Sequence, residues 1–240
     1  MGADRGALPI KYNCGGSLLT AQYVLTAAHC VYNIQDMKPV EVFLGDVDVR
    51  STGPEVQRIR IIKIILHPSY KRSKSYNDIA ILKLGRKARI SETVRPVCLE
   101  TRPTYVSLSD DSAPLLVTGW GATGLENDRS FVLLRTPIIR SVNHGECAPF
   151  YTGFARLPTG IDKNMVCAID VNKDRGSDAC QGDSGGPLIL ESTYHYSVIG
   201  VTSFGQPCGS YAPGIYTAVY PYLDWIEEQV WLNNDTEHEQ

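Results

Sequence analysis

The sequence has no hydrophobic run long enough to cross a membrane as a helix, since no stretch approaches about 18 consecutive apolar residues. It also lacks an excess of positive charge. Lys and Arg number 23 against 26 Asp and Glu, so the formal net charge is −3. Proteins that bind nucleic acid present a surplus of cations to the phosphate backbone. Neither a membrane nor a nucleic acid is therefore an expected partner.

Signs of several domains or of disorder are also missing. The 240 residues contain no fixed-period repeat, low-complexity segment or Gly/Ser linker. Hydrophobic residues at 43% and charged residues at 20% are ordinary for a globular protein and exclude a disordered chain. We expect one domain over residues 1–240, with a crossover between two halves near Leu99–Pro114 and a frayed polar tail at 233–240.

Cysteine, by contrast, is plentiful. The chain has 7 cysteines together with 21 glycines and 14 prolines. This composition is typical of an oxidising compartment and of a turn-rich β fold, so a secreted, extracellular protein is expected. Because the number of cysteines is odd, at least one has no partner within the chain, which suggests a bond to another polypeptide.

Short apolar or alternating runs, bounded by Gly, Pro, Asn and Ser, predict strands, because β-branched and apolar residues cluster in them over strand-like lengths. The predicted strands are Val40–Leu44, Val56–Leu66, Asp78–Leu84, Leu115–Trp120, Phe131–Arg140, Pro187–Leu190 and Tyr196–Phe204. One helix is predicted over Tyr222–Leu232, where Leu223, Ile226 and Val230 line one face and Pro221 stands near the start.

Three short segments each contribute one reactive residue: His29 in LTAAHC, Asp78 in NDIAIL and Ser184 in CQGDSGGP. A serine hydroxyl is a weak nucleophile, so it needs a base to take its proton and a third group to orient that base. Each segment alone has a structural alternative, namely a packed histidine, a turn aspartate and a Gly-rich turn. Together they supply each required residue type once.

With CGGSLL at Cys14–Leu19, VTGWG at Val117–Gly121 and YLDWI at the C-terminal helix, these segments resemble the trypsin-like branch of the chymotrypsin-like serine proteases. The resemblance covers nearly the whole chain. It implies an all-β fold of two six-stranded antiparallel β-barrels, with the active site in the cleft between them and a short C-terminal helix. The motifs and the sequence around them are similar to those of the catalytic domains of arthropod clip-domain proteases of the snake and easter type. That likeness implies limited proteolysis in an extracellular activation cascade, such as those of innate immunity.

The resemblance also implies catalytic roles. Ser184 is expected to attack the scissile carbonyl, with His29 as general base and then general acid, and with Asp78 orienting the imidazole. The backbone N–H groups of Gly182 and Ser184 are expected to bind the developing oxyanion. Ser203, at a position near the substrate, is expected to support Asp78 by a hydrogen bond.

Substrate preference follows from the residues that match the specificity pocket. Asp178 matches its base, while Gly205 and Gly214 match two wall positions that must be small. A buried carboxylate without a partner is costly, so the pocket favours a substrate that brings its own cation. Ala179 stands where trypsin carries a serine, which favours Arg over Lys because the guanidinium pairs bidentately. Phe204 replaces the common Trp on the wall.

The resemblance sorts the cysteines into three disulfides and one free thiol. The implied pairs are Cys14–Cys30, Cys147–Cys167 and Cys180–Cys208. Cys98 is then available for an interchain bond to an N-terminal light chain or clip domain. Protein substrates with Arg or Lys at the cleavage site, and serpin-type inhibitors, are the other partners that the family implies.

The N-terminus departs from the family pattern. Active members begin with a motif such as IVGG, whose amino group pairs with the aspartate before the catalytic serine, here Asp183. Met1–Asn13 has no such start, and Met1–Ile10 has no apolar core of the roughly 7–15 residues of a signal peptide. Weak or no proteolysis is expected of the chain as written. A catalytically silent binding or regulatory module is therefore the alternative to the enzyme.

A second alternative is an α/β-hydrolase, because the glycines around Ser184 also satisfy G-x-S-x-G. That fold orders its triad as serine, acid and histidine, and it expects a helix directly after the serine. Gly185, Gly186 and Pro187 are poor helix formers, and the histidines after Ser184 are poorly placed, since His195 follows it closely and His238 lies in the frayed tail. The trypsin-like interpretation is preferred.

No cofactor is expected. Some family members bind calcium in the loop that matches Gly45–Val56, where Asp46, Asp48 and Glu55 offer oxygen ligands. Gly53 and Val56, however, stand near positions where carboxylates are expected, so we predict no metal site. Separately, Asn234 begins an Asn-Asp-Thr sequence that fits an N-glycosylation acceptor.

Overall fold

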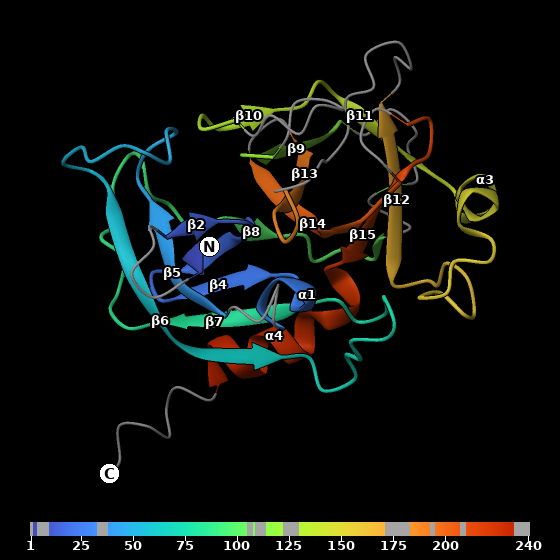
Figure 1. Ribbon diagram of the computed structural model, residues 1–240, viewed down its shortest axis with the longest axis horizontal. Coiled ribbons are helices and arrows are strands. Elements are labelled where there is room, and N and C mark those ends of the chain that lie inside the picture. Colours follow the sequence, from blue (N-terminus) through green and yellow to red (C-terminus); the bar gives the residue numbers. More distant parts are fainter. Residues whose placement is uncertain are drawn as a thin grey trace.

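Strands arranged in two sheets form most of the computed structural model, which describes residues 2–3, 10–32, 38–104, 108, 114–121, 130–170, 183–192, 195–206 and 210–232. The two sheets lie side by side, with the C-terminal helix beneath the first (Figure 1). No helix in these ranges is long and apolar enough to cross a membrane. The expected all-β, two-sheet fold is confirmed.

The first sheet is built from the N-terminal part of the chain. Its strands are β1 (Gly2–Ala3), β2 (Lys11–Tyr12), β3 (Ser17–Thr20), β4 (Tyr23–Thr26), β5 (Pro39–Leu44), β6 (Gln57–Leu66) and β7 (Ala80–Leu84), all with antiparallel pairings. Their order is β2-β1-β5-β6-β7-β4-β3. Because β2 and β3 at the two ends belong to one stretch, Lys11–Thr20, the sheet curls back on itself.

The second sheet closes into a ring. Its strands are β8 (Cys98–Leu99), β9 (Leu115–Gly119), β10 (Leu134–Arg135), β11 (Ile139–Val142), β12 (Met165–Asp170), β13 (Pro187–Glu191), β14 (Tyr196–Phe204) and β15 (Gly214–Ala218). The order β9-β11-β12-β15-β14-β13 returns to β9 through the β9–β13 pairing. Short β10 and β8 join at the sides, and β8 runs parallel to β14. These additions, with the division of one extended stretch into β2 and β3, account for seven and eight strands instead of six each.

Helical elements are few and short. They are α1 (Ala28–Val31), α3 (His144–Cys147), η1 (Ala148–Tyr151), η2 (Tyr220–Tyr222) and α4 (Leu223–Val230). The predicted C-terminal helix forms, but it is preceded by the 3₁₀ turn η2, which contains Pro221. Ile226 and Val230 are fully buried in the core of the first sheet, so the helix fixes the end of the chain there.

Some predicted strand boundaries are wrong. Phe131–Arg140 is not one strand: β10 ends at Arg135 and β11 begins at Ile139. Pro137 lies in the break, and it has no N–H group for a ladder hydrogen bond. Similarly, β7 begins at Ala80 and not at Asp78, because the preceding Asn77 has the left-handed φ of 53°.

Two of the three implied disulfides are present, Cys14–Cys30 and Cys147–Cys167. The third, between Cys180 and Cys208, lies outside the described residues. Cys98 is a free, exposed thiol, as expected.

Candidate active site

Asp78 joins the two sheets. Its carboxylate is buried and accepts hydrogen bonds from the backbone N–H of His29 at 2.8 Å and from the hydroxyl of Ser203 on β14. Its carbonyl oxygen accepts a hydrogen bond from Thr217 Oγ1 on β15 at 3.1 Å. The residue that enters β7 of the first sheet is thus held by two strands of the second. The support from Ser203 that the sequence implied is present.

The environment of Asp78 favours its charged form. Burial alone raises the pKa of a carboxylate, but the attraction of His29 and the hydrogen bonds from His29 and Ser203 outweigh burial, so the pKa of Asp78 is lowered. Asp78 therefore remains an anion that accepts hydrogen bonds and stabilises positive charge on its neighbour.

That neighbour is the imidazole of His29 on α1. Its Nδ1 lies 2.7 Å from Asp78 Oδ2, and its side chain is 24% exposed. The disulfide between Cys14 and Cys30 holds α1 against the start of the chain, and Cys30 Sγ lies 3.7 Å from His29 Nε2. With Nδ1 turned to the carboxylate, Nε2 is the nitrogen that remains to take up a proton.

Ser184 is brought to the same place by a close approach of two backbones. Its carbonyl oxygen accepts a hydrogen bond from the N–H of Gly15 at 2.8 Å, beside the Cys14–Cys30 disulfide. The next residue, Gly185, has a φ of 77°, and a Cβ atom there would overlap Thr26 Oγ1 and lie 2.8 Å from Gly15 O. Only glycine fits this contact.

The Ser184 side chain is half-buried. In the hydrogen bonds of the described ranges, none joins its hydroxyl to His29 Nε2. The structure therefore brings the three predicted residues to one junction of the two sheets and links two of them directly by side-chain contacts. Such bonds are often long in a free enzyme and tighten when substrate binds.

Asp183 lies buried beside the serine. Its Oδ1 accepts a hydrogen bond from the N–H of Gly121 at 2.8 Å. A Cβ atom at Gly119 or at Gly121 would overlap the carboxylate, so the VTGWG segment forms a close-fitting cradle for it. The predicted ion pair of Asp183 with an N-terminal amino group stays a prediction.

The walls of the expected specificity pocket are only partly described. Gly205 and Gly214 face each other, and a Cβ atom on Gly205 would lie 3.8 Å from Gly214 Cα. Phe204 stacks on Phe154 with ring centroids 5.8 Å apart and is met edge-on by Tyr151. The remaining predicted site residues, Asp178, Ala179, Gly182 and the acceptor Asn234, lie outside the described residues.

The carboxylates of the calcium-type loop each have a partner within the chain. Asp46 accepts a hydrogen bond from the N–H of Asp48, Asp48 pairs with Arg50 at 2.7 Å, and Glu55 lies 3.3 Å from Arg89. In the described part of the chain, the one group of three candidate metal ligands is Cys14, His29 and Cys30, and both sulfurs are in the disulfide.

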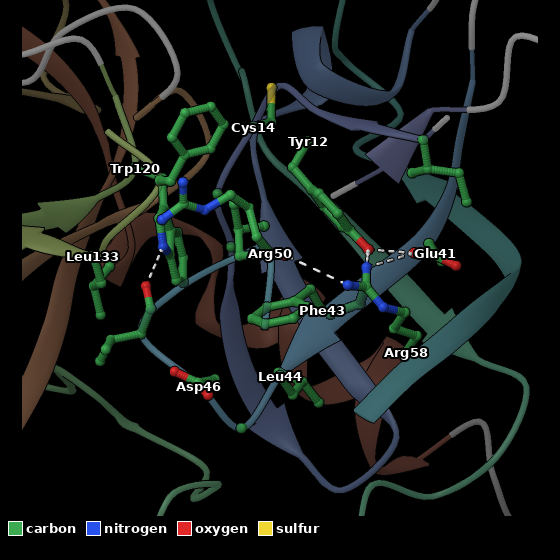
Figure 2. A pocket seen from close by; sticks show the side chains of 18 of the residues that line it. Tyr12, Cys14, Glu41, Phe43, Leu44, Asp46, Arg50, Arg58, Trp120 and Leu133 are labelled. Atoms are coloured by element: carbon green, nitrogen blue, oxygen red, sulfur yellow. Dashed lines mark hydrogen bonds and ion pairs between the residues drawn. The ribbon is translucent and has the colours of Figure 1, made fainter. Parts of the chain in front are cut away.

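A cavity of about 1520 Å³ lies between the first sheet and the segment around Trp120, and its lining reaches Cys14 and Gly15 at the edge of this junction (Figure 2). Tyr12 and Phe43 line it, and the guanidinium of Arg58 lies over their rings. Trp120 Nε1 donates to Val47 O at 2.7 Å and bridges the two sides. The cavity does not include His29, Asp78 or Ser184.

The sequence analysis missed three residues around Asp78: Thr217, which donates to its carbonyl oxygen, the preceding residue Asn77, and Tyr222, which donates to the Asn77 side chain. Asn77 had a usable signal, since Asn is enriched among residues with positive φ. The contacts of Thr217 and Tyr222 span 139 and 145 residues of chain, respectively, and no local sequence pattern predicts contacts at such a separation.

Comparisons with known proteins agree with this geometry. A family model described as Trypsin matches residues 3–226. "Serine protease Hayan" of Drosophila melanogaster is 40% identical over 255 residues, covering 96% of this chain and 38% of Hayan. "Serine protease snk" of the same organism is 41% identical over 223 residues, covering 91% and 49%, respectively. "Vitamin K-dependent protein C" of Mus musculus is 36% identical over 229 residues, covering 92% and 46%. The chain therefore spans less than half the length of these relatives.

Proposed function

The chain belongs to the trypsin family of serine proteases, and from that premise we propose that it is a serine endopeptidase that cleaves protein substrates after Arg, with Lys second. One observation carries the proposal: Asp78 holds the Nδ1 side of His29 at 2.7 Å, at the place where Ser184 is bound to Gly15. A base, its orienting acid and a serine meet there, as acyl transfer requires.

In this proposal Ser184 Oγ forms a bond to the scissile carbonyl carbon while His29 Nε2 takes the hydroxyl proton. Asp78 stabilises the imidazolium. The N–H groups of Gly182 and Ser184 bind the oxyanion. His29 then returns the proton to the leaving amine as the C–N bond breaks, and water attacks the acyl-enzyme by the same route.

The preference for Arg rests on Asp178 at the base of the pocket and on the open walls at Gly205 and Gly214. A carboxylate in a confined site attracts a substrate cation because burying it unpaired is unfavourable. Ala179 offers no hydroxyl to a lysine ammonium, whereas a guanidinium reaches Asp178 with two parallel hydrogen bonds.

We further propose an extracellular setting. The two disulfides are typical of an oxidising compartment, and the exposed thiol of Cys98 suits a bond to a light chain or clip domain. The likeness to Hayan and snk supports limited proteolysis of a protein precursor in an activation cascade, with serpin-type proteins as inhibitors.

The test is hydrolysis of paired chromogenic peptides with Arg or Lys before the scissile bond, by the chain as written and by a version that carries an Ile-Val-Gly-Gly start, in which the activity is expected. We expect faster cleavage after Arg, loss of all cleavage in Ser184→Ala, and loss of the preference for cations in Asp178→Ser. If Asp178→Ser cleaved the Arg peptide as fast as the unmodified chain does, the assignment of Asp178 to the pocket would be refuted. Specific binding of a protein ligand by a folded chain that cleaves neither peptide would favour the catalytically silent module.

A further inference from the structure

Positive charge is concentrated in one part of this weakly acidic chain. Residues 56–97 contain eleven Lys or Arg and two carboxylates, although the net charge of the whole chain is −3. This segment includes β6, β7 and the turn after β7, which lie next to one another in the first sheet (Figure 1).

Strand register brings two runs of cations together. β6 pairs antiparallel with β7, and Ile61 is opposite Leu84. Beyond that pair, the N–H of Gly85 donates to Arg60 O at 2.8 Å. The Gln57 side chain then binds both the N–H and the carbonyl of Arg89, at 2.7 and 2.8 Å. The segment 85–89 therefore runs back along 57–60.

This arrangement produces a strip of cations on the outer face of the sheet, which we call the basic strip. Its members are Arg60, Lys63, Arg86, Lys87 and Arg89, all exposed. Arg89 lies 3.3 Å from Glu55, in a pair whose side chains are 60% and 48% exposed and which is therefore weak. In the described part of the chain the other four make no ion pair. The strip thus keeps several uncompensated charges close together.

Arg58 lies between the basic strip and the cavity lined by Tyr12 and Phe43. Its guanidinium lies 5.0 Å from the Phe43 ring centroid and 3.6 Å from Glu41 Oε1, so it is engaged on the cavity side. The cations of the strip, in contrast, lie over no aromatic ring among the described residues, and the exposed apolar side chains next to them in the sequence are Ile62 and Ile90. A partner that docks on the strip must gain its affinity from charge.

We propose that the basic strip binds a sulfated polysaccharide. From Gln57 to Lys63 the strand spans about 20 Å at about 3.3 Å per residue, enough for one extended chain to meet several cations. Guanidinium groups pair bidentately with oxyanions, and each neutralised charge releases a counterion. An acidic peptide carries fewer charges per length than a sulfated polysaccharide and gains most of its affinity from aromatic or large apolar anchors in pockets, whereas the strip offers only the two exposed isoleucines Ile62 and Ile90.

This binding surface does not depend on the proteolytic activity. A polysaccharide held there would concentrate the protein on an extracellular surface and leave Ser184 and His29 free, because neither residue belongs to the strip. Tethered polyanions raise the local concentration of proteins that bind them and speed encounters between them.

The test is binding of heparin by the whole chain, measured by calorimetry over a series of salt concentrations. We expect Arg60→Glu/Lys87→Glu to weaken binding about 10- to 100-fold and to lower the salt slope by about two. The matched control is Lys71→Glu/Lys74→Glu, an equal charge change at exposed positions outside the strip. We expect less than about a threefold effect from it. Arg60→Gln/Lys87→Gln repeats the test should charge reversal disturb folding.

Three results would overturn the proposal. One is the absence of heparin binding at about 0.15 M salt. Another is an equal loss of heparin affinity in the strip variant and the control variant, which would show that binding responds to net charge alone. The last is equal competition by polyglutamate at the same charge concentration, which would assign the strip to acidic peptides.

Discussion

The hydroxyl of Tyr222 donates a hydrogen bond to Asn77 Oδ1 at 3.0 Å and so ties the start of the C-terminal helix to the residue before Asp78. The other end of the Asn77 side chain donates to Ser69 O at 3.3 Å. Burial, with the charges of Asp162 and Asp78, raises the pKa of Tyr222, so its hydroxyl stays a donor. The left-handed backbone at Asn77 is held from both sides.

This relationship predicts that Tyr222→Phe lowers kcat by about two- to tenfold with little change in KM, because a partly buried hydrogen bond that steadies Asp78 through Asn77 is lost. The measurement is steady-state hydrolysis of an Arg peptide. The control is Tyr220→Phe, which removes an exposed hydroxyl from the same turn.

Asn77→Gly distinguishes positioning from general stability, since glycine keeps the left-handed backbone without the side chain. In the Asn77→Gly background Tyr222→Phe should have no further effect on kcat. The same loss in both backgrounds would show that Tyr222 does not act through Asn77.

Gly185→Ala is expected to abolish activity and to destabilise the fold. The new methyl group would overlap Thr26 Oγ1 and press on Gly15 O, and the backbone has a φ of 77°. Gly153→Ala is a matched control, because its φ is 76° and a Cβ atom there meets nothing within 4 Å.

Urea unfolding measures both changes. We expect Gly153→Ala to lower the free energy of unfolding by about 1–2 kcal/mol through backbone strain alone. Gly185→Ala should lower it by at least about 2 kcal/mol more, because its methyl group also clashes. Equal losses would mean that the close approach of the two backbones at Gly185 does not exist in solution.

The lowered pKa of Asp78 predicts a loss of stability in acid. A free aspartate has a pKa of about 3.9. Because the folded-state pKa is lower, the contribution of Asp78 is fully present above about pH 4 and disappears as the pH falls through the folded value. Asp78→Asn cannot titrate, so its unfolding free energy should depend less steeply on pH below about 4.

Urea unfolding at a series of pH values from about 6 to 2.5 gives this dependence. Asp224→Asn, at an exposed position on α4, is the control and should follow the unmodified chain. An unchanged slope for Asp78→Asn would contradict the lowered pKa.

The sequence predicted the fold class well, and its short motifs around His29, Asp78 and Ser184 name three residues that the structure brings to one junction. It predicted boundaries less well, since Pro137 and the left-handed Asn77 interrupt apolar runs that look continuous. It missed the strands β1, β2, β3, β4, β8, β12 and β15 altogether.

The long-range support of the site could not be predicted. Thr217 reaches Asp78, and Tyr222 reaches Asn77, only after the two sheets and the C-terminal helix have packed. The basic strip likewise depends on β6–β7 register, which places residues 85–89 beside residues 57–60. Local patterns contain neither relationship.

Covalent labelling of the nucleophile tests the central claim most directly. The chain, and a version that carries an Ile-Val-Gly-Gly start, are treated with a fluorophosphonate probe, and the modified peptide is identified by mass spectrometry. The account predicts a label on Ser184 in at least one of the two forms, abolished by His29→Ala while the fold is retained. A label on another residue, or none on Ser184 in either folded form, would contradict it.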